Sequence, residues 1–205
     1  MIEFKNVYIE TRHPILTDEC YSFKEGMIYG IVGINGSGKT TTFRTMMDLL
    51  KPKSGQILFD GEPVTKKRDI VFYYETVEWL DLNLSGKDYL NFVQKIWKSQ
   101  IPIDSILQEW GMEDYINIPI KKYSLGMKQK LVACMYIISD AKYLIMDELT
   151  SALDENNRQY FFNQIQNLKK QGKTIILSSH YKEEIYDYCD KVISFRDHKL
   201  CEDKT

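Results

Sequence analysis

The chain has 205 residues, with 27 basic and 29 acidic side chains and a formal net charge of −2 at pH 7. Its 43% hydrophobic and 27% charged residues are typical of a globular protein and exclude a disordered or collagen-like chain. The near-neutral charge argues against a general affinity for nucleic acid. The length predicts one domain whose core is large enough to fold without disulfides or structural metal ions.

Strand-like and helix-like stretches alternate along the first 75 residues, which is typical of an α/β protein. A helix is expected from Lys39 to about Leu50, because Pro52 and Gly55 follow it. The expected strands of this part are residues 2–9, 20–23, 27–32, 56–59 and 70–74.

Apolar residues at helical spacing dominate residues 76–139. Amphipathic helices are expected around residues 90–97 and 103–110, and a third helix begins at Ser124. The sheet pattern then returns, with strands expected at residues 143–146, 174–177 and 192–195 and a helix at 156–171. We therefore predict a single domain over residues 1–205, with a core from 1–75 and 140–205 and a helical insert at 76–139.

The cysteines and the apolar runs indicate the cellular compartment of the protein. The four cysteines form no CxxC pair, so reduced thiols are expected rather than a zinc site. The charged start of the chain predicts no secretory signal. The longest apolar run, residues 131–138, is far shorter than the roughly 18–20 residues that span a bilayer. We expect a cytoplasmic protein that contacts a membrane only through a partner.

A glycine-rich segment between the third strand and the first helix matches the phosphate-binding pattern G-x-x-x-x-G-K-[ST]. Its residues are Gly33, Ile34, Asn35, Gly36, Ser37, Gly38, Lys39 and Thr40, and Thr41 follows them. Backbone N–H groups of such a loop point at phosphates, and the helix N-terminus adds positive potential. Lys39 is expected to reach the β- and γ-phosphates and Thr40 to ligate Mg²⁺. An ordinary glycine turn is the alternative, but the flanking strand and helix favour phosphate binding.

A phosphate loop occurs in kinases, GTPases and ATPases alike, so a second motif must distinguish them. The apolar segment 143–146 ends in Asp147 and Glu148. We expect Asp147 to hold the Mg²⁺ shell and Glu148 to orient the attacking water. An acidic helix cap after a buried strand is the alternative interpretation of this pair.

The chain resembles the ATP-binding cassette (ABC) ATPases over essentially its whole length. Tyr123-Ser124-Leu125-Gly126-Met127-Lys128-Gln129 is similar to the family signature, usually LSGGQ. Ser151-Ala152-Leu153-Asp154 is similar to the D-loop, and Ser178-Ser179-His180 to the switch-histidine segment. The order of these motifs excludes kinases and GTPases.

The resemblance implies a P-loop NTPase (RecA-like) core, an antiparallel β subdomain, an inserted helical subdomain and hydrolysis of MgATP. It implies that Ser124 and Gly126 contact the ATP held by a second ATPase subunit and that His180 contacts the γ-phosphate. It also implies a transmembrane permease as partner, with the protein at the inner face of the cell membrane. The Tyr-Ser-Leu-Gly-Met-Lys variant is similar to that of bacterial exporters for antibiotics and bacteriocin peptides.

Three positions depart from the family pattern. Leu125 and Met127 replace the usual Gly and Gln of the signature, and Glu75 stands at the usual glutamine of the Q-loop. A Glu75 carboxylate could still hold the metal shell. The usual adenine-stacking aromatic residue is missing, which leaves Arg12 or His13 as candidates. A soluble ABC ATPase without a permease, with a ribosomal or assembly role, and a slow nucleotide-gated binding module are the alternative functions.

Overall fold

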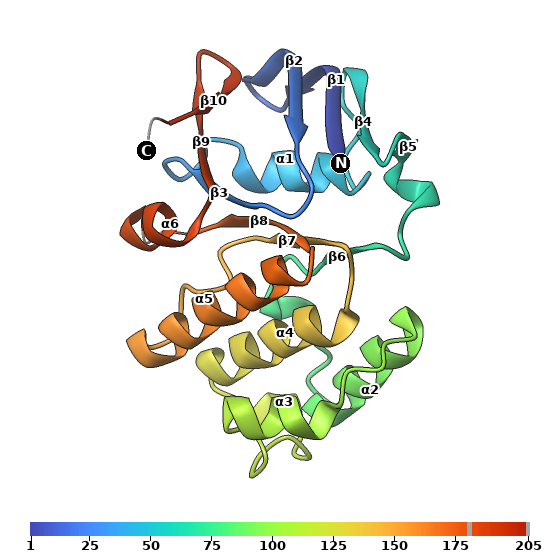
Figure 1. Ribbon diagram of the computed structural model, residues 1–205, viewed down its shortest axis with the longest axis vertical. Helices are drawn as coiled ribbons and strands as arrows, with labels where there is room; N and C mark the ends of the chain where they lie inside the picture. Colours follow the sequence, from blue (N-terminus) through green and yellow to red (C-terminus); the bar gives the residue numbers. More distant parts are fainter. Residues whose placement is uncertain (180–181, 204–205) are drawn as a thin grey trace.

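The computed structural model describes residues 1–179 and 182–203, and within them the strands form a four-stranded and a six-stranded sheet (Figure 1). The four-stranded sheet has the order β2-β1-β4-β5, and its paired neighbours are antiparallel. Its strands are β1 (Ile2–Glu10), β2 (Pro14–Phe23), β4 (Ser54–Phe59) and β5 (Glu62–Pro63). This sheet confirms the expected antiparallel subdomain.

The strand β2 is longer than its sequence suggests. We expected only residues 20–23, before the turn signal Glu25-Gly26, whereas β2 already begins at Pro14. In the structure Glu19 pairs with Val7 of β1 and is only 3% exposed. Its carboxylate accepts a hydrogen bond from the Leu200 N–H at 3.1 Å, and this bond allows an acidic side chain to be buried in a strand.

The six-stranded sheet is mixed and has the order β10-β9-β3-β8-β7-β6. Only β10 runs antiparallel to its neighbour, β9. Every residue of β3, β7 and β8 is buried, as expected for parallel strands covered on both faces. The bounds are β3 (Ile28–Val32), β6 (Val71–Tyr73), β7 (Tyr143–Met146), β8 (Thr174–Ser178), β9 (Lys191–Arg196) and β10 (Lys199–Glu202).

Three helices follow one another between β6 and β7: α2 (Gly86–Trp97), α3 (Ile103–Trp110) and α4 (Leu125–Ser139). Figure 1 shows them stacked below the sheet, at the end of the molecule remote from β1 and β2. The side chains of Ser85 and Ser124 cap α2 and α4, in line with the helix start expected at Ser124. The residues of α4 from Leu131 to Ser139 are all buried, so this helix forms the centre of the lower core.

The other helices are α1 (Lys39–Met46), α5 (Glu155–Lys170) and α6 (Lys182–Tyr188). The helix α1 ends before the expected Leu50, because Asp48 adopts a left-handed φ of 59° and the Leu49 N–H bonds back to the Arg44 carbonyl at 2.9 Å. Short 3₁₀ turns cover Val64–Lys66, Val77–Trp79 and Ile120–Lys122. Among the described residues, no helix is long and apolar enough to cross a membrane.

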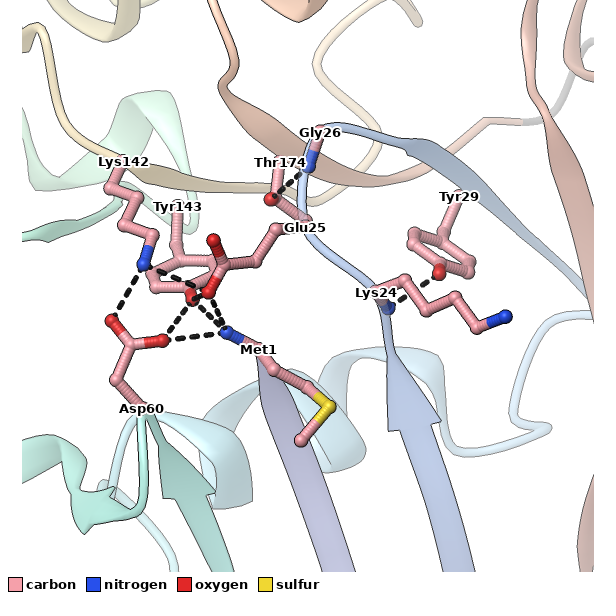
Figure 2. A network of polar contacts seen from close by, with 9 residues as sticks. All are labelled: Met1, Lys24, Glu25, Gly26, Tyr29, Asp60, Lys142, Tyr143 and Thr174. Carbon is pink, nitrogen blue, oxygen red and sulfur yellow. Dashed lines mark hydrogen bonds and ion pairs between the residues drawn. The ribbon is translucent and has the colours of Figure 1, made fainter.

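A cluster of charged groups joins the two sheets at the start of β1 and β7 (Figure 2). Lys142 donates to Asp60 at 2.8 Å and to Glu25 at 2.9 Å, and the Tyr143 hydroxyl donates to Asp60 at 2.5 Å. The Met1 ammonium group lies 2.5 Å from Glu25 and 2.6 Å from Asp60. These contacts hold the antiparallel sheet against the start of β7, at the opposite end of that strand from Asp147 and Glu148.

Candidate functional site

The phosphate loop lies between β3 and α1 and depends on two of its glycines. Gly38 has a φ of 101°, and a Cβ atom built there would lie 2.3 Å from Ile15 Cγ2 of β2. A Cβ at Gly33 would lie 2.5 Å from the Ser37 hydroxyl oxygen. Larger residues would therefore push the loop away from β2 and open its curl.

Lys39 folds back over this loop. Its side chain is 6% exposed, and its ammonium group donates to the Gly33 carbonyl at 3.0 Å. The same nitrogen lies 3.6 Å from Glu148 Oε1. The structure therefore brings the loop lysine to the proposed water-orienting carboxylate, although more than 100 residues separate them.

Asp147 and Glu148 follow β7 and are held by the neighbouring elements. The Thr40 hydroxyl donates to Asp147 Oδ2 at 2.5 Å, and the Ser178 hydroxyl donates to Asp147 Oδ1 at 2.6 Å. Ser178 also accepts the Glu148 N–H at 3.0 Å. Burial raises the pKa of Asp147, and the hydrogen bonds from Ser178 and Thr40 oppose this rise. The sequence motif did not indicate this role for Ser178, because β8 is distant in the chain.

The donor set fits Mg²⁺. Thr40 and Asp147 present two oxygen atoms side by side, and Mg²⁺ is usually bound by one or two protein oxygen ligands together with water and phosphate. The described residues contain no group of three or more His, Cys, Asp or Glu side chains that could hold a metal ion.

A cavity of about 890 Å³ surrounds the phosphate loop, a size typical of small-molecule sites. It extends from Lys39 and Glu148 to the β1–β2 turn and the β9–β10 hairpin. His13 lines this outer end, whereas Arg12 does not line it. Phe195 and His198 of the hairpin also line the cavity. No local signal in the sequence indicated these two residues, because contacts between the two sheets, such as the bond from the Thr17 N–H to the His198 carbonyl at 3.0 Å, bring the hairpin beside β2.

A smaller cavity of about 380 Å³ adjoins Thr40, Asp147 and Glu148 on the side of α4. Glu75 lines it, but both of its carboxylate oxygens are bound by Arg44 and Tyr73. The structure therefore places Glu75 beside the expected metal ligands and pairs it with a cation that the sequence did not indicate.

The signature segment reaches the nucleotide site through Leu125 and Gln129, which line the smaller cavity together with Thr40. The Ser124 hydroxyl accepts the Met127 N–H at 3.2 Å and thereby caps α4. Ser124 and Gly126 line neither of the two cavities. Gln129 joins α4 to the segment after β7, since its side chain donates to Ser151 at 2.8 Å and accepts the Ala152 N–H at 2.7 Å. The expected switch residue, His180, lies outside the described residues.

Comparison with known proteins agrees with these features. The family described as "ABC transporter" matches residues 16–151. The ATP-binding protein YybJ of Bacillus subtilis (strain 168), named as an ABC transporter component, is 32% identical over 98% of this chain and 94% of its own length. The lantibiotic transport ATP-binding protein SrtF of Streptococcus pyogenes is 32% identical over 87% of this chain and 79% of its own length.

A solved ATP-binding subunit of an ABC transporter superimposes with a TM-score of 0.87, at 21% identity, over 100% of this chain and 90% of that one. This likeness shows the ABC ATPase fold, with its mixed sheet and antiparallel subdomain. Together with the family match and the two relatives, it identifies the protein: the chain belongs to the ABC transporter family, as an ATP-binding subunit with an ATP-hydrolysing domain.

Proposed function

We propose that this subunit binds MgATP, dimerises around two nucleotides and drives export through a separate membrane permease. The observation that carries the proposal is the cluster of Lys39, Thr40, Asp147 and Glu148, in which two motifs from distant parts of the chain meet. The name of SrtF, a lantibiotic transport protein, supports transport, and export as the direction rests on the similarity of the signature variant to that of bacterial exporters.

Each residue of the cluster has a distinct task. Lys39 compensates the charge of the β- and γ-phosphates, while the backbone of residues 33–41 surrounds them. Thr40 and Asp147 hold Mg²⁺, which would supply a Lewis acid to the phosphate oxygens. Glu148 accepts the proton of the attacking water, and its backbone bond to Ser178 fixes its position. His180 is proposed as the γ-phosphate contact from the family resemblance alone.

The position of the signature segment supports a two-subunit site. Ser124 is exposed, and Leu125 beside it is 54% exposed. The N-terminus of α4 therefore faces outward, where a phosphate held by a second copy or a related ATPase subunit can meet it.

The surface around α2 supports a membrane partner. Trp79, Leu82, Phe92 and Ile96 are large apolar side chains that are about half exposed. Such residues are expected to be covered by another protein, and we propose that the permease covers them at the inner face of the cell membrane. The net charge of −2 gives no support to a nucleic-acid partner.

Replacement of Glu148 tests the catalytic part of the proposal. Glu148→Gln preserves the shape of the side chain but removes the base and one negative charge. We expect ATP binding to persist, hydrolysis to fall by at least a hundredfold, and a nucleotide-bound dimer to accumulate in light-scattering measurements with MgATP. Hydrolysis near the wild-type rate would remove Glu148 from this role.

The permease and the direction of transport need a separate experiment. Co-purification of the subunit with the product of a neighbouring gene that encodes apolar spans would support the transporter, and uptake into or release from vesicles would give the direction. Full ATPase activity with no such partner would favour the soluble factor, and ATP binding with very slow turnover would favour the nucleotide-gated module.

A further inference from the structure

The Arg44–Glu75 pair is the feature of the nucleotide site that no motif explains. Glu75 is 8% exposed at its side chain, whereas Arg44 is 45% exposed and lies over it. Arg44 Nε donates to Glu75 Oε2 at 2.7 Å, and Arg44 Nη2 bonds Glu75 Oε1. The Tyr73 hydroxyl donates to Glu75 Oε2 at 2.9 Å. The carboxylate is thus held by a two-pronged guanidinium contact and a tyrosine.

The pair lies one helical turn from the proposed metal ligands. Arg44 follows Thr40 by four residues on α1, so both project from the same face of that helix. Thr40 contacts Asp147 after β7, and Arg44 contacts Glu75 after β6. Since Tyr73 is in register with Ile145 in the parallel β6–β7 pair, Glu75 and Asp147 occupy equivalent positions beyond the ends of adjacent strands.

The closeness of Glu75 to Asp147 places negative charge beside the expected phosphate site. Two neighbouring carboxylates, followed by Glu148, lie where a triphosphate with several negative charges must bind. An uncompensated charge at Glu75 would oppose that binding, because a largely buried charge is poorly screened by water and salt. Arg44 contacts both oxygens of the Glu75 carboxylate, so its positive charge compensates the carboxylate and the pair is neutral only while Arg44 is present.

We propose that Arg44 is a positioning residue of the nucleotide site, which neutralises Glu75 and holds its carboxylate beside the metal ligands. The net charge of the Arg44–Glu75 pair is then zero, like that of the glutamine that the family pattern has at position 75. This inference rests on the proposed function, because it requires MgATP to bind beside Thr40 and Asp147.

The effects of the two partners on nucleotide affinity should have opposite signs. Arg44→Met leaves the Glu75 charge uncompensated and should weaken binding of a fluorescent ATP analogue about tenfold in the presence of EDTA, and less with excess Mg²⁺. Glu75→Gln removes the negative charge and should bind the analogue more tightly than the wild type in EDTA. The double variant carries the same net charge at this position as the wild type and should bind within about threefold of it. Arg44→Lys keeps the positive charge and should also stay within about threefold of the wild type.

A purely structural ion pair would give a different pattern. If the pair only held α1 against β6, both single variants would bind the analogue more weakly than the wild type, and this result would overturn the proposal. An Arg44→Met variant that binds the analogue like the wild type would also overturn it. A double variant as weak as Arg44→Met would also overturn it, because Arg44 would then attract the phosphates by itself. Thermal unfolding of each variant shows that the full chain is folded during the titrations.

Two controls separate this inference from the proposed function. Lys87→Met removes the cation of the Lys87–Asp104 pair between α2 and α3, remote from the site, and should leave affinity unchanged. Failure of the wild type to bind the analogue, or binding that survives Lys39→Ala, would contradict the proposed function. Normal, Lys39-dependent binding without opposite effects of Arg44 and Glu75 would contradict only the role of Arg44.

Discussion

Replacement of Ser178 by alanine should reveal how strongly β8 holds the catalytic carboxylates. Ser178 is 2% exposed, and its hydroxyl donates to Asp147 at 2.6 Å while it accepts the Glu148 N–H at 3.0 Å. Alanine keeps the Cβ atom and removes only this hydroxyl. The variant therefore leaves one buried carboxylate oxygen and one backbone N–H without their serine partner.

The expected loss in the free energy of unfolding follows from these two hydrogen bonds. A hydrogen bond to a charged group contributes about 1.5–3 kcal/mol, and one between neutral groups about 1 kcal/mol. The free energy of unfolding of Ser178→Ala should therefore be about 2–4 kcal/mol lower than that of the wild type. Because the Glu148 backbone loses its anchor, kcat for ATP hydrolysis should fall more than ATP affinity.

Urea denaturation followed by tryptophan fluorescence measures the loss, provided that the m-value stays constant. Ser194→Ala is a matched control, since its hydroxyl donates to Asp203 at 2.9 Å in a partly exposed setting on β9. That variant should lose less than about 1 kcal/mol. A Ser178→Ala loss no larger than that of Ser194→Ala would refute the idea that these buried bonds position Asp147 and Glu148.

Three further predictions concern the phosphate loop, the interface of the sheets and the outer end of the cavity. Lys39→Ala should weaken ATP binding at least tenfold, because a charge-assisted hydrogen bond is worth about 1.5–3 kcal/mol; an unchanged Kd for a fluorescent analogue would contradict it. Burial opposes ionisation of Asp60, but bonds from Lys142 and its other partners hold its pKa well below the usual range, so Asp60→Asn should be less stable by about 1–3 kcal/mol at pH 7. This stabilisation is complete above the unfolded-state pKa of about 3.9 and is lost as pH falls through the lower folded-state pKa, so the deficit measured by denaturation should shrink below about pH 4. His13→Ala should weaken ATP binding about fivefold or more if the imidazole stacks on the base, and a larger loss in Arg12→Ala, measured by the same titration, would contradict that assignment.

Local signals in the sequence were sufficient for several elements. The apolar run of β7 matched its predicted bounds, residues 143–146, because a strand buried on both faces must be apolar throughout. Ser124 marked the start of α4, because a serine side chain can satisfy a free N–H group of the first turn. The phosphate loop was recognisable because its glycine conformations and the strand–loop–helix context are properties of a short segment.

Elements whose stability comes from distant partners were missed. The short strands β5 and β10 and the helix α6 were not predicted. The strand β10 pairs with β9, and its Leu200 N–H bonds to the buried Glu19 of β2, an interaction that spans 181 residues. No periodicity within four residues can indicate such a strand, because its hydrogen-bond partners lie elsewhere in the chain.

The sequence by itself determined the chemistry that each motif can perform, because residue type and short-range spacing define a phosphate loop or a pair of carboxylates. Only the tertiary structure decided which groups meet. It bonded Ser178 to both Asp147 and Glu148 and Arg44 to Glu75, and it brought His198 to the lining of the cavity around the phosphate loop. These contacts follow from the order of strands in the two sheets, which is a property of long-range pairing and cannot be read from any single segment.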